Sequence, residues 1–229
     1  AVQASRGFTN TGIISSLLVM LAVAFLAFAI DTWLLNAVLV KAFANLPPIA
    51  FFRKIVPAQV VGFSTQSSTG TLPVTTRILT ERIGVSPEVA NFTAPLGTTI
   101  GMPGCAGIWP VLTAIYGVHG LGLTYGLKDY AILAVMALFV SLGTAGVPGT
   151  ATVVTASVLT AVGLPLEIMV LTIPISAIAD TGRTATNITG AMVASTIVAH
   201  SERELDRDVF NQLDHSLTES DPAGVPAHV

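Results

Sequence analysis

The apolar run Ile49–Ile83 is interrupted at its centre by Ser64–Pro73, which reads STQSSTGTLP. Most of these residues are weak helix formers, so we predict two helices joined by a polar tip. Two basic residues lie on each side of the tip, the outermost being Arg53 and Arg82. A segment with like-charged ends and a polar tip is typical of a re-entrant hairpin, which enters and leaves a membrane on the same side.

The pattern occurs a second time. The run 130–166 has its own tip at Ser141–Gly149, which reads SLGTAGVPG, and both tips contain a Thr-x-x-x-Pro motif. A helix with polar residues at mid-depth follows each hairpin, and the first of these is broken where Pro103 removes a backbone donor. If the first hairpin opens inward, this helix makes the second open outward. The two halves then form an inverted repeat, as in secondary transporters.

The composition indicates that the solvent of this chain is lipid. Of the 229 residues 52% are hydrophobic and 10% are charged, against about 25% charged in a soluble domain. Charged residues are missing from four stretches that each reach the roughly 20 residues needed to span a bilayer: 7–30, 55–76, 89–127 and 130–166. We therefore predict an all-α polytopic membrane protein. The chain has no basic stripe, which excludes nucleic-acid binding, and its single cysteine excludes a cysteine-based metal cluster.

The same features divide the chain into four parts. More basic residues flank the first hairpin than flank the second, so that side is predicted to face the cytoplasm. Because the chain opens on a polar stretch without Met, we also expect helices upstream of it. The predicted parts are a transmembrane helix (1–45), the first hairpin with the broken helix (46–126), the second hairpin with the last helix (127–200) and a polar, solvated cytoplasmic tail (201–229).

Asp180 and Arg183 are the only charged residues between Glu167 and Glu202. A charge at membrane depth costs at least about 2.5–3.5 kcal/mol on insertion scales and usually has a function. The two residues share a helix face, which Asn187 extends. An amino acid needs an acceptor for its ammonium group and a forked donor for a carboxylate, and Asp and Arg supply these. The pattern favours a ligand site, although a self-satisfied Asp–Arg pair is the simpler alternative.

The tips and the last helix resemble those of the dicarboxylate/amino-acid:cation symporters. The similarity covers roughly residues 10–200, with the motifs in the family's order. It implies the elevator-type transport core of a trimeric symporter in a bacterial inner membrane, coupled to H⁺ or Na⁺. The stretch GMPGCAGIWP at 101–110 is most similar to the L-cystine branch. From their places beside the helix break, Cys105 is expected to be a packing residue and Trp109 to flank the cavity.

The resemblance also implies roles for individual residues. Asp180 would accept the substrate ammonium, Arg183 would bind a distal carboxylate, and Thr184 and Asn187 would hold polar substrate groups. Backbone of the two tips would close around the substrate at Ser67, Ser68, Thr69, Gly143, Thr144, Ala145 and Gly146.

The coupling cation is less well defined by the resemblance. Two of the family's sodium sites lack their usual ligands, because the break reads Gly101–Cys105 instead of Asn-Met-Asp-Gly-Thr and Ala191 replaces an aspartate. A proton on Asp180 is one candidate. The other is a sodium site built mostly from backbone at Thr99, Met102, Ser141, Leu142 and Thr144.

The sequence thus predicts an importer of an amino acid, most simply L-cystine, and not an enzyme. Within the same class, acidic amino acids or C4-dicarboxylates are alternative substrates. A channel with two re-entrant loops is a rival class, but it has little need for a buried Asp–Arg pair. An intramembrane aspartyl enzyme needs two facing carboxylates, whereas only Asp180 is expected deep in a span, with Asp31 near the end of its helix.

Overall fold

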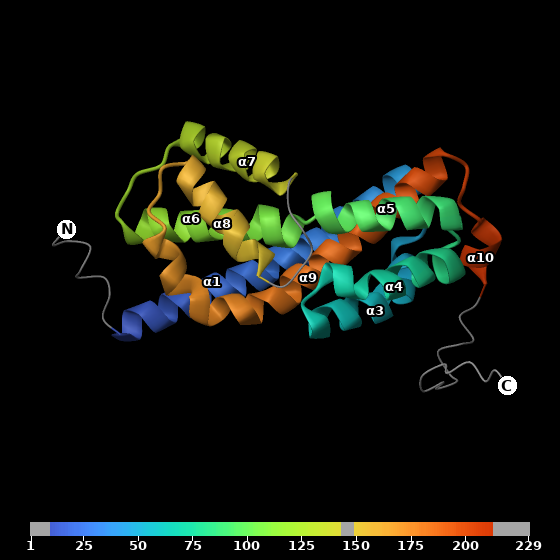
Figure 1. The fold of residues 1–229 in the computed structure, drawn as a ribbon, viewed down its shortest axis with the longest axis horizontal. Helices are drawn as coiled ribbons and strands as arrows, with labels where there is room; N and C mark the ends of the chain where they lie inside the picture. Colours follow the sequence, from blue (N-terminus) through green and yellow to red (C-terminus); the bar gives the residue numbers. More distant parts are fainter. Residues whose placement is uncertain (1–9, 143–148, 213–229) are drawn as a thin grey trace.

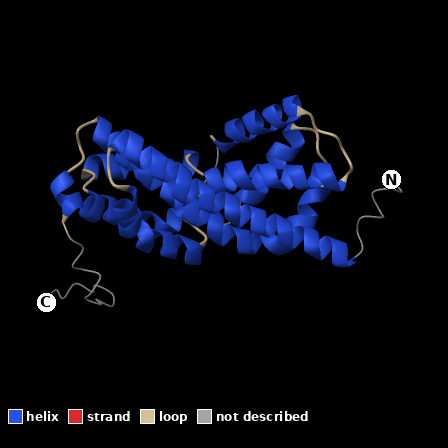
Figure 2. Ribbon diagram, turned by 180° about the vertical axis from the view of Figure 1, so that it is seen from behind, coloured by secondary structure: helices blue, strands red, loops and turns tan. Residues whose placement is uncertain are grey.

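The computed structural model describes residues 10–142 and 149–212, and the regular elements of these ranges are all helical (Figures 1 and 2). The all-α prediction is therefore confirmed for them. The helices, with π-helical segments marked η, are α1 (Asn10–Ala29), η2 (Ile30–Leu35), α2 (Asn36–Leu39), η3 (Val40–Ala44), α3 (Pro48–Thr65), α4 (Ser68–Ile78), η4 (Leu79–Ile83), α5 (Pro87–Ile100), η5 (Pro103–Ile108), α6 (Trp109–Gly120), α7 (Leu127–Ser141), α8 (Thr150–Ala161), α9 (Glu167–Ser201) and α10 (Arg207–Asn211).

The first four segments form one continuous helix that contains two π-helical stretches. This helix continues to Ala44. It ends where Asn45 takes a left-handed φ of 51°, just before Pro47 and Pro48, which cannot continue a helix at that point. Among the described residues, two helical stretches are long and apolar enough to cross a membrane, Gly12–Ala44 and Pro87–Gly120.

Helices α3 and α4 flank the first predicted tip and pack against each other. Its tip turns at Gln66, which has a left-handed φ of 54°. The Ser67 hydroxyl then accepts a hydrogen bond from the Gly70 amide at 3.0 Å, which satisfies one of the unpaired amides that every helix start leaves. In the second half, α7 and α8 pack together in the same way, and residues 143–148 between them lie outside the described residues.

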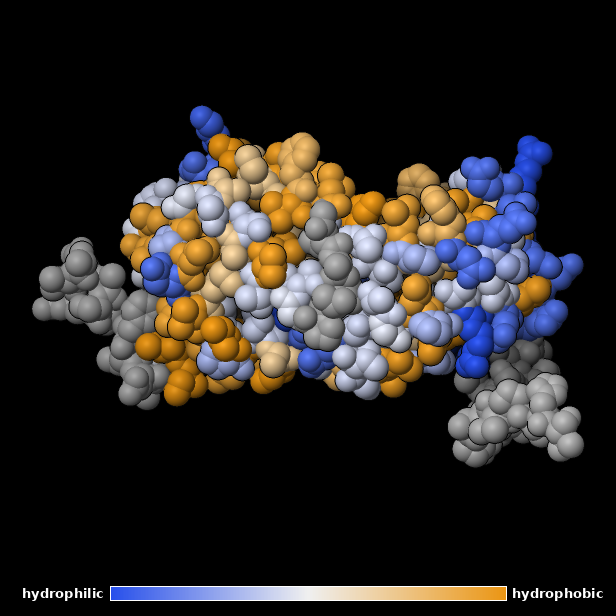
Figure 3. Space-filling model, viewed as in Figure 1, coloured by the Kyte–Doolittle hydropathy of each residue, from blue (hydrophilic) through white to orange (hydrophobic). Residues whose placement is uncertain are grey.

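Helix α9 runs along most of the molecule (Figure 1) and joins two hydrophobic cores. One core lies between α1, η5, α6, α7, α8 and the first half of α9. The other lies between η3, α3, α4, η4, α5, α10 and the second half of α9. The part of the surface away from α10 carries many apolar side chains, while the end near α10 is hydrophilic (Figure 3).

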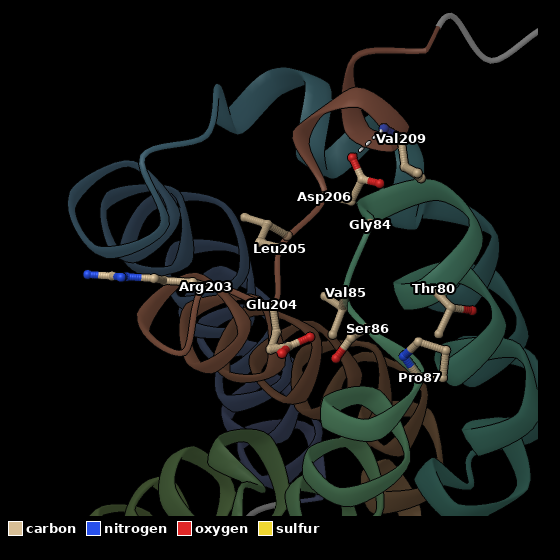
Figure 4. Close-up of a pocket in the computed structure, with 10 residues that line it drawn as sticks. All are labelled: Thr80, Gly84, Val85, Ser86, Pro87, Arg203, Glu204, Leu205, Asp206 and Val209. Carbon is tan, nitrogen blue, oxygen red and sulfur yellow. Dashed lines mark hydrogen bonds between the residues drawn. The ribbon is translucent and has the colours of Figure 1, made fainter.

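Residues 203–212, here called the C-terminal strap, fold back on the hydrophilic end of the molecule. The Ser86 amide donates to the Glu204 carbonyl at 3.0 Å, and the Asp206 amide donates to the Gly84 carbonyl at 2.7 Å. These residues line a cavity of about 380 Å³ (Figure 4). Phe210 is buried beneath the Lys54 ammonium, which lies 5.4 Å from the ring centroid. The start of the polar tail is therefore docked through its backbone and Phe210, while its charged side chains from Glu202 to Asp208 are exposed.

Candidate functional site

Arg183 lies near the middle of α9 and is only 2% exposed. Its Nη2 lies 3.0 Å from Asp180 Oδ1, and its Nε donates to the same oxygen at 3.2 Å. Nη2 also donates to the Ser176 carbonyl oxygen at 2.9 Å. The face-sharing predicted from the three-residue spacing is therefore present, and in this conformation the two charges pair with each other.

Trp109 forms one wall of the site. It is buried at the start of α6, and its ring centroid lies 4.6 Å from Cζ of Arg183. A cation held over an indole ring away from water is stabilised by about 2 kcal/mol or more. The second terminal nitrogen of Arg183, Nη1, is buried and has no hydrogen-bond partner among the described residues. A buried donor left unpaired costs about 1–3 kcal/mol, so a carboxylate that reached Nη1 would relieve this cost.

The helix break is held against α9 by Asn187. Pro103 lacks an amide hydrogen, so the chain leaves α5 and begins η5 with free amides. The Asn187 Oδ1 accepts from the Gly104 amide at 2.8 Å and from the Cys105 amide at 3.4 Å. Its Nδ2 donates to the Cys105 sulfur at 3.1 Å. Asn187 was expected to hold a polar substrate group; here its amide is engaged by the break.

Gly104 allows this close approach. A Cβ at this position would lie 2.6 Å from the Arg183 carbonyl oxygen, which is inside van der Waals contact. Only glycine therefore lets η5 rest directly on the backbone that carries the guanidinium.

The first tip reaches α9 one turn before Asp180. The Gln66 Nε2 donates to the Ala177 carbonyl oxygen at 3.1 Å. Of the predicted tip residues, Ser68 is buried and Thr69 is exposed, while Ser67 caps α4 as described above. Thr184 is buried on α9, with its methyl group next to Gly62 of α3.

Several predicted residues are not gathered into one set of ligands. Gly143, Thr144, Ala145 and Gly146 lie outside the described residues. Of the sodium-site candidates, Met102 is buried, whereas Thr99 and Leu142 are exposed. The Ser141 hydroxyl donates to the Leu138 carbonyl at 2.7 Å. Within residues 10–142 and 149–212, His, Cys, Asp and Glu do not cluster in a way that could hold a metal.

A model of the sodium:dicarboxylate symporter family matches residues 2–201. The chain belongs to this family. Its relatives carry the names of transport proteins and not of enzymes, which confirms the prediction that the chain is not an enzyme.

Individual relatives narrow the comparison. The L-cystine uptake protein TcyP of Bacillus anthracis is 37% identical over 178 residues, which are 77% of this chain and 38% of that protein. TcyP of Bacillus licheniformis is 35% identical over 179 residues, 75% and 37% of the two chains. An uncharacterized symporter of Haemophilus influenzae is 38% identical over 156 residues, which are 68% of this chain and 36% of that protein. The chain therefore spans about two fifths of the length of the curated relatives it matches.

The structure of this symporter chain also shows polar residues that the sequence analysis misjudged or missed. Asp31 was expected near the end of its helix, but the neighbouring Thr32 hydroxyl donates to the Thr186 hydroxyl at 3.2 Å. Asp31 therefore lies level with the part of α9 just after Arg183, which corrects that expectation. The signal was available in the sequence, because Thr32 and Asn36 form a four-residue polar spacing inside an apolar helix. Ser176, seven residues before Arg183, was missed.

Proposed function

We propose that this chain forms the substrate-carrying core of a secondary active symporter that imports L-cystine together with a cation, H⁺ or Na⁺. The observation that carries the proposal is the buried guanidinium of Arg183. It is held by Asp180 and Ser176, stacks on Trp109, and keeps one nitrogen without a partner among the described residues. Such a group is prepared to receive a carboxylate.

The chemistry of L-cystine suits this arrangement. Cystine carries an ammonium and a carboxylate at each end, and its disulfide is apolar and polarisable. Arg183 would bind the carboxylate of one end and Asp180 an ammonium, while the Trp109 ring would provide an apolar wall. TcyP relatives named for L-cystine uptake support this choice. Acidic amino acids and C4-dicarboxylates are the alternative substrates, since they too carry a distal carboxylate.

The remaining substrate contacts would come from both tips and from α9. They comprise Ser67, Ser68, Thr69, Gly143, Thr144, Ala145, Gly146, Thr184 and Asn187. Release of Asn187 from the break would let its amide turn to the substrate. A sodium ion, if it is the coupling ion, would lie among Thr99, Met102, Ser141, Leu142 and Thr144.

The architecture fits an elevator-type mechanism. In this proposal the pairs α3–α4 and α7–α8 are re-entrant hairpins of an inverted repeat, with the chain divided at residues 45, 126 and 200. The full-length protein is a homotrimer with several spans in a bacterial inner membrane. The irregular backbone at the first tip and at the break supports this, because such backbone occurs at membrane depth only where protein buries it or a wet cavity is present.

Uptake of labelled L-cystine into proteoliposomes tests the proposal, with the full-length protein and separately imposed H⁺ and Na⁺ gradients. We expect accumulation that saturates, resists unlabelled aspartate, and disappears in Arg183→Ala. Arg203→Ala is the matched control, because Arg203 is exposed on the strap. If aspartate or succinate accumulates instead of cystine, the substrate assignment is wrong. Flux that does not saturate and ignores both gradients would indicate a channel.

A further inference from the structure

The helix that precedes the first hairpin carries one acidic residue inside the membrane-spanning stretch Gly12–Ala44, and this residue is Asp31. It is half-buried, and its neighbour Thr32 contacts Thr186 at 3.2 Å. One turn earlier, Phe28 lies against Gly182. Asp31 is therefore at the depth of the Arg183 site. An ionisable group at this depth is a candidate functional group by default.

The helix has a widened turn at Asp31. The segment Ile30–Leu35 is π-helical, and the Asn36 backbone amide donates to the Asp31 carbonyl. The Asn36 side chain donates to that carbonyl at 2.8 Å and to the Asp31 carboxylate at 3.2 Å. Widened turns of this kind often occur at functional sites. The Asn36 side-chain amide, which is neutral, is therefore the hydrogen-bond donor to the Asp31 carboxylate, and it also bonds the Asp31 carbonyl.

No cation among the described residues faces this carboxylate. The segments α1 and α2, which pack against η2, contain no charged side chain. Within the span α9 carries only Asp180 and Arg183, which pair with each other, and its remaining charges lie at its ends. On its own helix, the nearest charge is Lys41, ten residues further on and roughly 15 Å along the axis.

Helix α3 faces η2 across a groove of about 320 Å³ lined by Thr32 and Gln59 among others. Its basic residues, Arg53 and Lys54, lie in its first two turns, and Lys54 donates to the Gln212 carbonyl of the strap at 3.3 Å. Neither of these basic residues lines the groove between α3 and η2. A carboxylate without a cation is held most readily in a membrane by binding a proton.

We propose that Asp31 binds the coupling proton of this symporter, in place of Asp180, to which the sequence pointed. Asp180 is poorly suited to this task, because its proton would remove the counter-charge from Arg183. Asp31 takes a proton from water on one side of the membrane, becomes a neutral carboxylic acid for the crossing, and returns the proton to water on the other side. The inference rests on the proposed function.

The test separates exchange from net uptake. Exchange of cystine across the membrane needs no net proton movement, whereas accumulation driven by a pH gradient does. In the full-length protein, we expect the rate of cystine exchange by Asp31→Asn to stay within about threefold of that of the unchanged protein. The accumulation driven by a pH gradient should fall at least tenfold. Exchange in this variant should also no longer depend on pH. Asp129→Asn is the matched control, since Asp129 is an exposed acid in the first turn of α7.

Proton uptake by the purified protein provides a second readout. Adding L-cystine to weakly buffered protein with a pH indicator should cause absorption of protons by the unchanged protein and by Asp31→Glu, but not by Asp31→Asn. Gradient-driven accumulation that survives in Asp31→Asn overturns the proposal. So does uptake by the unchanged protein that follows Na⁺ and ignores pH, although the symporter function then stands. Absence of any cystine exchange in the unchanged protein would remove the proposed function itself.

Discussion

Gly104→Ala adds one methyl group at the point where η5 rests on α9. The new Cβ would lie 2.6 Å from the Arg183 carbonyl oxygen and 2.8 Å from its Cα. Both are backbone atoms inside a long helix, so neither can rotate away. Because non-bonded carbon atoms pack at about 3.5–4.0 Å, η5 has to withdraw from α9 by roughly 1 Å.

A withdrawal of this size has two consequences. It stretches the 2.8 Å bond from the Gly104 amide to Asn187 Oδ1 beyond hydrogen-bond range. Overpacking costs about 1–3 kcal/mol, and a lost hydrogen bond about 1 kcal/mol. We therefore expect the free energy of unfolding to fall by about 2–4 kcal/mol. Cystine affinity should also fall, because Trp109 follows η5 directly and moves away from Arg183.

Gly107→Ala is the matched control, since it adds the same methyl group to the same segment. A Cβ at Gly107 would meet nothing within 4 Å, so this variant should be neutral or up to about 1 kcal/mol more stable. The assays are thermal unfolding of the purified full-length protein in detergent and calorimetry of L-cystine binding. Equal stability and equal Kd in the two variants would refute the packing argument.

Two further substitutions test the wall of the site and the strap. Trp109→Ala should weaken L-cystine binding about 30-fold in calorimetry, since stacking on a dry guanidinium is worth about 2 kcal/mol. Trp33→Ala is the control, because Trp33 is 65% exposed, and it should leave the Kd unchanged. Equal Kd values for the two variants would contradict the role of the Trp109 ring. Phe210→Ala should lower the free energy of unfolding by about 3–5 kcal/mol. Phe92→Ala, at an exposed residue, should lower it by about 0.5 kcal/mol or less. A similar thermal stability of the two variants would show that the Phe210 ring does not anchor the strap.

Much of the fold follows from local pattern. The polar stretch around Gln66 consists largely of weak helix formers, and Pro103 cannot donate a helical hydrogen bond, so both breaks were predictable. The Asp180–Arg183 contact follows from helical spacing alone. In each case the cause lies within a few residues of the effect, which is why a single sequence suffices.

The remainder depends on residues that are distant in sequence. Asn187 accepts from the Gly104 amide, which lies 83 positions earlier in the sequence. The sequence of either segment alone does not predict this hydrogen bond. The depth of Asp31 was misjudged because it depends on the register between two helices, which the Thr32–Thr186 contact defines. The charged composition of the strap predicts exposed side chains, as observed, but it does not reveal that the backbone of the strap and the ring of Phe210 dock on distant residues.

The strap also has a consequence for biosynthesis. Gly84 and its partner Asp206 are separated by roughly 120 residues, which a ribosome adds in roughly 6–24 s at 5–20 residues per second. During that interval the first hairpin is already made, yet the Gly84 carbonyl lacks its donor and Lys54 lacks the ring of Phe210. A nascent chain that stalls before Asp206 thus exposes this end of the hairpin to membrane chaperones and proteases, and arrival of the strap marks the moment at which that exposure ends.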